Sequence, residues 1–241
     1  NCTITQMISA SNAGVLSVNI TGGTLDRLAV TNAATGSITG SISGTNVKLL
    51  VGTNNGTVNV SVKGNATVSS VITTNGASGS ATIEVSGATV SGDLVAANAG
   101  VATINLGSNI KIATTSANLV GVNTKTTTIN VNSALTLTGM NSFAFVGDSS
   151  GTINLNINAA TSISGDTISG VVSKYSNTNT DEKAINVVLK ANYTLKGTTV
   201  SPIAGNTTGA GAFDATKNLN YTQNGFNIIV NGTNFDPNPV T

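Results

Sequence analysis

The sequence predicts an all-β solenoid, in which short strands wind into stacked coils. An apolar residue that centres a short strand recurs every 21 or 22 residues over five occurrences, and the later steps lengthen to 25, 26 and 32 residues. Charged residues make up only 8% and aromatic residues 3% of the chain, whereas hydrophobic residues reach 39%. Abundant Thr, Val and Ile favour strands over helices. Repeats of this length cannot bury an apolar face alone, so they stack. The recurring residues are Leu25, Val47, Val68, Val90, Ile112, Leu137, Ile163 and Leu195.

One coil can be followed through residues 80–100. Ile83 and Val85 alternate with polar neighbours, which predicts a half-buried strand. Val90 centres a second short strand, and residues 94–96 form a third. Three strands separated by glycine-containing turns predict a triangular coil. Aliphatic residues equivalent to Ile83 recur upstream of each short strand, at Val18, Ile38, Val60, Ile104, Ile129, Ile153 and Ile185.

Glycine and asparagine recur at fixed places in the repeat and predict its corners. Glycine follows the first strand of successive coils at Gly23, Gly44, Gly64, Gly87 and Gly107, where it allows the positive φ of a tight turn. Asparagine tolerates a sharp corner and hydrogen-bonds local backbone. When coils stack, such side chains form an amide ladder. We therefore predict a structural ladder, rather than a catalytic or ligand site, at Asn32, Asn54, Asn75, Asn98 and Asn123, with Asp148 at the next equivalent place.

These three-strand coils with Gly and Asn ladders resemble the right-handed parallel β-helix of secreted polysaccharide lyases, autotransporter passengers and other bacterial surface proteins. The resemblance covers residues 14–205 and includes no catalytic motif. It implies a right-handed parallel β-helix of about eight three-strand coils, flanked by extra β segments in residues 1–13 and 206–241. Each flanking segment is interpreted as a cap or a subunit-contact segment. A β-sandwich or barrel of short strands is the alternative, but it does not require phased repeats.

Composition disfavours most kinds of chemistry. The chain has no histidine, so the usual Ser/His/Asp, Cys/His and His-metal sites cannot form. Nine Asp and Glu residues form no acidic cluster in the sequence, and no cofactor or metal is expected. The net charge of +1, without basic clusters, argues against nucleic-acid binding. The sequence contains no stretch of about 18 apolar residues, so we expect no membrane-spanning helix. The single cysteine, Cys2, is interpreted as a small buried hydrophobe or one half of an intermolecular bridge.

The ends of the stack favour one function over others. A solenoid exposes unpaired strand edges that are either capped or used for pairing. We expect an extracellular structural protein that self-associates into a filament or surface layer, with subunit contacts at Ile4, Ile8, Phe226, Ile228 and Val230. A surface adhesin or carbohydrate-binding stalk facing a host or glycan surface is the alternative. A polysaccharide-active enzyme is a weaker one, and self-capping of a monomer is the competing interpretation of the termini.

Overall fold

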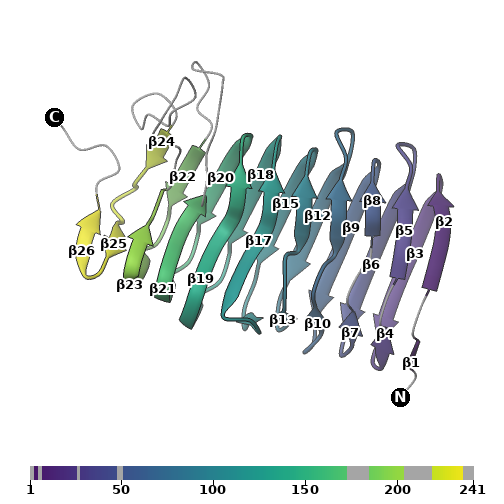
Figure 1. The fold of residues 1–241 in the computed structure, drawn as a ribbon, viewed down its shortest axis with the longest axis horizontal. Coiled ribbons are helices and arrows are strands. Elements are labelled where there is room, and N and C mark those ends of the chain that lie inside the picture. The colour runs from purple at the N-terminus through teal and green to yellow at the C-terminus, as the bar shows by residue number, and fades with distance from the viewer. Residues whose placement is uncertain are drawn as a thin grey trace.

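The chain folds as an all-β stack of parallel strands, a parallel β-helix, with no helix in the described residues (Figure 1). The computed structural model describes residues 3–4, 7–25, 28–47, 51–172, 185–203 and 219–235. Every strand pair is parallel except the last one along the chain. The polar segment 174–184, Cys2 and the prolines Pro237 and Pro239 lie outside the described residues.

Three sheets make up the sides of the stack. Sheet A consists of two-residue strands, in the order β1 (Thr3–Ile4), β4 (Thr24–Leu25), β7 (Asn46–Val47), β10 (Thr67–Val68), β13 (Thr89–Val90) and β16 (Lys111–Ile112). Sheet B has the order β2 (Met7–Asn12), β5 (Leu28–Asn32), β8 (Val51–Asn54), β11 (Ile72–Asn75), β14 (Val95–Asn98), β17 (Ser116–Asn123), β19 (Leu135–Ser149), β21 (Thr161–Val172), β23 (Tyr193–Ser201), β25 (Ile228–Val230) and β26 (Thr233–Phe235). Sheet C has the order β24 (Leu219–Thr222), β22 (Ile185–Leu189), β20 (Thr152–Ile157), β18 (Thr126–Val131), β15 (Val101–Leu106), β12 (Ser80–Val85), β9 (Thr57–Lys63), β6 (Ser37–Ser43) and β3 (Val15–Thr21).

The coil at residues 80–100 has the predicted three strands, β12, β13 and β14. Its corner after β12 is made by Gly87, whose φ of +60° suits glycine because a Cβ would be strained there. Gly44 and Gly64 occupy the same corner in earlier coils with the same φ. In the coil that begins with β15 the positive φ moves to Asn109, a residue type that tolerates the left-handed region. Sequence spacing therefore locates this corner in the regular part of the stack.

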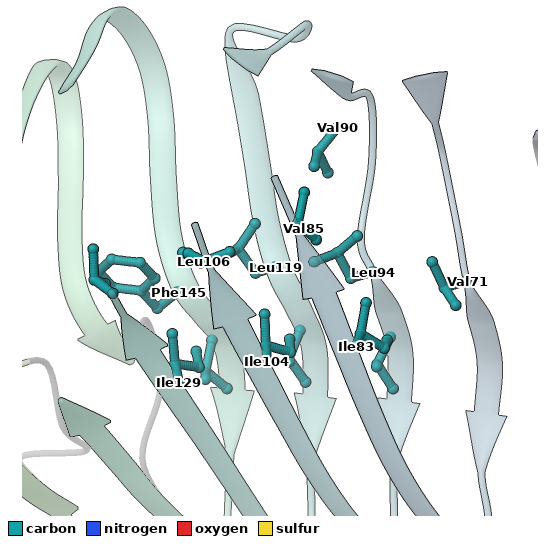
Figure 2. Packing of buried hydrophobic residues seen from close by; sticks show 14 of the residues in the cluster. Val71, Ile83, Val85, Val90, Leu94, Ile104, Leu106, Leu119, Ile129 and Phe145 are labelled. Atoms are coloured by element: carbon teal, nitrogen blue, oxygen red, sulfur yellow. The ribbon is translucent and has the colours of Figure 1, made fainter. Parts of the chain in front are cut away.

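The core is a set of apolar columns that run from coil to coil. Val60, Ile83, Ile104 and Ile129 are register partners in consecutive strands of sheet C, and each is at most 3% exposed. Figure 2 shows Ile83, Ile104 and Ile129 pointing into the interior, where Leu94, Leu119 and Phe145 also lie. Burying such a side chain stabilises the fold by about 1.5–3 kcal/mol.

The predicted aliphatic column is wrong at Ile38, Ile153 and Ile185. Val18 pairs with Gly40 rather than Ile38, and Ile129 pairs with Leu155 rather than Ile153. Each error is two residues along a strand, so the residues still face the interior because side chains alternate with a period of two. Hydrophobic alternation predicts which side of a strand faces the interior, but it cannot distinguish between two registers that differ by two residues.

The later coils depart from the three-sided pattern. Val90 pairs with Ile112 as predicted, but sheet A ends there. Leu137 lies instead in the long strand β19 and pairs with Ile163, which in turn pairs with Leu195. The longer repeats of this region supply strands of 9 to 15 residues, so one long strand takes up both the second and the third strand of the predicted coil.

A buried aromatic cluster fills the wider later coils. Phe143 and Phe145 are 1% and 0% exposed and meet edge to face, with ring centroids 5.2 Å apart. Tyr193 lies 6.2 Å from Phe145, and its complete burial raises the pKa of its hydroxyl. Edge-to-face pairs add about 0.5–1.5 kcal/mol to the stabilisation from burial. The large rings occupy space that aliphatic side chains fill in the earlier coils.

The described terminal strands belong to the stack. At the start of the chain β1, β2 and β3 are the first strands of sheets A, B and C. Beyond residue 205, β24 extends sheet C and β25 extends sheet B. The strand β26 then turns back antiparallel to β25 and covers its edge (Figure 1). One end of sheet B is thus an antiparallel hairpin, with β26 as the edge strand.

Candidate functional site

The five predicted ladder asparagines lie at equivalent corners, because each is the last residue of its sheet B strand. They are at most 1% exposed. The Nδ2 of each donates to the Oδ1 of the next, with distances of 2.8 Å from Asn32 to Asn54, 2.8 Å from Asn54 to Asn75, 2.7 Å from Asn75 to Asn98 and 2.9 Å from Asn98 to Asn123.

The second hydrogen of each amide nitrogen reaches the main chain of the next coil. Asn75 Nδ2 donates to the Val101 carbonyl at 3.0 Å, and Asn98 Nδ2 donates to the Thr126 carbonyl at 2.9 Å. Asn98 Oδ1 also accepts from the Gly100 N–H at 3.3 Å. Buried polar groups stabilise a fold only when they are paired. The ladder therefore satisfies its own amides and joins sheet B to the start of sheet C.

The ladder extends beyond the predicted residues at both ends. Asn12 donates to Asn32 Oδ1 at 2.9 Å, and Asn123 donates to Ser149 Oγ at 3.0 Å. The expectation that Asp148 continues the series is wrong, because Asp148 is exposed and pairs with Val122, while Ser149 pairs with Asn123. Adjacent strand residues face opposite sides, so only the second of this pair can point inward.

Glycines next to the ladder leave no room for a side chain. A Cβ at Gly100 would lie 3.0 Å from Asn75 Nδ2 and would collide with the carbonyl oxygens of Gly79 and Gly76. A Cβ at Gly56 would lie 2.9 Å from Asn32 Nδ2. The glycines that precede the sheet C strands thus serve close packing rather than positive φ, and the ladder with these glycines forms a buried structural corner.

The predicted subunit-contact residues have different environments. Ile4 in β1 pairs with Leu25, and Ile8 in β2 pairs with Ala29. Ile228 is fully buried and pairs with Tyr193 of its own chain, which leaves its side chain no surface to offer another subunit. Val230 is half-buried and pairs with Leu195. Phe226 remains 37% exposed in the turn before β25.

A second set of polar columns covers the outer surface of sheet C. These columns were not predicted from the sequence. On β15, β18 and β20 the outward side chains carry no charge, and we call this surface the amide face. Asn130 Nδ2 donates to Asn105 Oδ1, and Asn156 Nδ2 donates to Asn130 Oδ1, both at 2.7 Å. The recurring outward Asn in the Ile-Asn and Leu-Asn pairs of these strands was the available signal. The members of the amide face are Thr103, Asn105, Thr128, Asn130, Asn154 and Asn156, all half-buried.

Glu84 lies next to the amide face, in register with Asn105. Two shallow grooves border this residue. One, of about 300 Å³, includes Ser86, Asn105 and Asn132 in its lining, and the other, of about 280 Å³, includes Asn59 and Thr82. Both present hydroxyl and amide groups beside a single carboxylate. Such surfaces can hydrogen-bond a polar partner, but they do not enclose a substrate.

Acid–base and metal chemistry have little support in the described residues. No group of three His, Cys, Asp or Glu residues that could hold a metal ion occurs in that part of the chain. Asp93 is half-buried, and desolvation raises the pKa of its carboxyl. A Cβ added at Gly121 would lie 2.7 Å from the Asp93 Oδ2.

No protein-family model, curated protein or solved structure matches this chain significantly. The stretches with described coordinates contain no helix long and apolar enough to cross a membrane. Fold and surface chemistry are therefore the basis for a functional assignment.

Proposed function

We propose that this chain is a structural protein of the cell exterior that self-associates into a filament or surface layer. The observation that carries the proposal is the open edge of the stack at β3. This strand has one neighbour, β6, among the described residues. An unpaired edge strand is a template for pairing with another chain.

Main-chain groups of alternate β3 residues point toward the open edge. The Gly14 carbonyl accepts from the Ser37 N–H at 2.8 Å, and the Gly22 N–H donates to the Ser43 carbonyl at 2.9 Å. Even-numbered residues therefore turn toward β6. In a regular parallel strand the odd-numbered residues then turn their N–H and C=O groups the other way. Ser17 and Asn19 are exposed on this edge, ready for strand addition.

The opposite end of sheet B supports an asymmetric arrangement. The edge strand there is the three-residue antiparallel β26, and Ile228 is used within the chain. Contacts through Ile228 and Val230 are thus less favoured than contacts through β1, β2 and β3. Among the predicted contact residues, Ile4 and Ile8 lie on these first strands.

An extracellular, secreted location is part of the same proposal. Its support is the low charge, the Asn, Thr and Ser surface and the resemblance to β-helix proteins of bacterial surfaces. A stack whose buried asparagine ladder and apolar columns are both satisfied internally suits a load-bearing or space-filling role.

Negative-stain electron microscopy of the purified chain tests the proposal through the β3 edge. We expect filaments or sheets for the native chain, and loss of them for Asn19→Pro, because proline removes an edge donor without interrupting the bonds to β6. Asn19→Thr keeps the donor and favours a strand, so it serves as the matched control and should still assemble. A native chain that remains monomeric at all concentrations contradicts the proposal.

A surface adhesin or glycan-binding stalk is the second candidate. The observation that favours it is the pair of grooves at Glu84, lined by amide and hydroxyl groups that suit a hydroxyl-rich ligand. The described residues lining these grooves include no aromatic ring, so each contact would be weak and binding would depend on repetition. Titration with neutral hexasaccharides such as maltohexaose and cellohexaose tests this candidate.

A further inference from the structure

We propose that the amide face is a self-association surface, on which a second copy of this chain packs with its coil axis antiparallel. This inference rests on the proposed self-assembly and assigns a lateral contact, distinct from the contact along the open β3 edge. The argument depends on the regular register of the face, on its spare hydrogen-bonding groups and on the charges at its two margins.

The amide face is regular enough to match a copy of itself. The strands β15, β18 and β20 pair residue by residue over six positions without a register shift. Strands in a sheet repeat at about 4.8 Å, so the Asn and Thr columns of two copies have the same pitch. Faces with identical columns can interdigitate as in stacked sheets.

The amides retain hydrogen-bonding capacity toward a partner. Asn130 donates one hydrogen to Asn105 and accepts one from Asn156. A side-chain amide has two N–H groups and two carbonyl lone pairs, so one donor and one acceptor site stay available on the outer side. The amide columns of the second copy offer the complementary groups in the same arrangement.

Opposite charges at the two margins of the face select the orientation. Glu84 on β12 and Lys190, directly after β22, are both exposed, and they flank the three uncharged strands. Neither side chain has a hydrogen-bond or ion-pair partner within the described part of the chain. A two-fold axis along β18 places β12 of one copy opposite β22 of the other.

The same axis brings the charges within reach of each other. Glu84 lies in the column of Asn105, Asn130, Asn156 and Val188. Lys190 is two residues beyond Val188, a displacement of about 7 Å along the strand, which a long lysine side chain spans. The two-fold produces two such Glu–Lys pairs for each dimer. A parallel arrangement would instead place like charges together.

A charge-swap cycle tests the orientation directly. Sedimentation velocity of the full chain carrying Asn19→Pro, which removes the β3 edge contact, should show a dimer that Glu84→Lys and Lys190→Glu each weaken about tenfold, since each swap turns two attractive pairs into two repulsive ones. The double variant Glu84→Lys/Lys190→Glu should recover the native affinity. Lys196→Glu makes the same charge change at an exposed site on sheet B and should leave the affinity unchanged. Circular dichroism checks that all variants keep the native strand content.

Several outcomes overturn the inference, and they separate it from the broader proposal. A double variant as weak as the single variants, or a Lys196→Glu variant equally weakened, excludes this orientation. If assemblies persist in microscopy but none of the charge variants changes the sedimentation behaviour, the contact through the amide face is excluded. Self-assembly through another contact then still stands. A native chain that stays monomeric at about 1 mM overturns both. A monomer that binds maltohexaose or cellohexaose and loses binding on Glu84→Lys assigns the face to a glycan instead.

Discussion

Replacing one buried asparagine of the ladder by alanine should cost far more stability than the same change in an exposed amide column. Asn75 is 0% exposed and takes part in three side-chain hydrogen bonds: it accepts from Asn54 at 2.8 Å and donates to Asn98 at 2.7 Å and to the Val101 carbonyl at 3.0 Å. Alanine leaves one buried donor on Asn54 and one buried acceptor on Asn98 without these partners, together with the part-buried Val101 carbonyl. Each unsatisfied buried group costs about 1–3 kcal/mol, so we expect a loss of at least about 2 kcal/mol.

Asn130→Ala is the matched control for this prediction. Asn130 also takes part in an amide column, with two hydrogen bonds of 2.7 Å, but it is half-buried on the outer face. Water can replace the lost partners there, so we expect a loss below about 1 kcal/mol.

Urea unfolding followed by circular dichroism measures both variants. Because stacked repeats can unfold in parts, hydrogen exchange should accompany it and locate the destabilised coils around residues 54–98. Equal losses of stability for Asn75→Ala and Asn130→Ala would refute the reasoning, since burial is the property that distinguishes the two columns.

Three further changes test other parts of the stack. Gly100→Ala should destabilise the fold, detectable as a lower melting temperature, because its Cβ collides with the Gly79 carbonyl oxygen; an unchanged melting temperature contradicts the close packing. Phe145→Ala should cost about 3–5 kcal/mol in urea unfolding by opening a cavity in the aromatic cluster, and a loss below about 1 kcal/mol would place the ring outside the core. Asp93→Asn should be more stable than the native chain at neutral pH, and this advantage should fade as the pH falls through the raised pKa of Asp93 and disappear below the ordinary carboxyl range. Melting temperatures that differ by the same amount at every pH would contradict the desolvation of that carboxyl.

Much of the fold could be predicted from the sequence because each regular coil has the same packing and hydrogen-bonding requirements. Asn54 and Asn98 each end a strand and precede a glycine by two residues, and this spacing reflects both the ladder and the close packing at its corner. The parallel stacking followed from the period, since a repeat of this length cannot bury its apolar face alone. The right-handed winding stays a prediction.

Other features depend on tertiary packing that local pattern does not encode. The merging of the second and third strands into β19 depends on where Phe143 and Phe145 find space in the core. The two-residue slip of Ile153 preserves the inward face, so alternation alone cannot detect it. The hairpin at the end of sheet B places Ile228 in the interior, although its apolar strand is equally suited to a contact between subunits.

The buried ladder is the feature that most directly distinguishes this stack from other all-β arrangements. Nuclear magnetic resonance of the side-chain amides measures it without any substitution. We expect nuclear Overhauser contacts from the Asn75 amide hydrogens to Asn98 and Val101, residues 23 and 26 positions away, together with exchange much slower than that of Asn130. An Asn75 amide that exchanges as fast as Asn130 and shows no contact with either residue would contradict the parallel register and the internal ladder together.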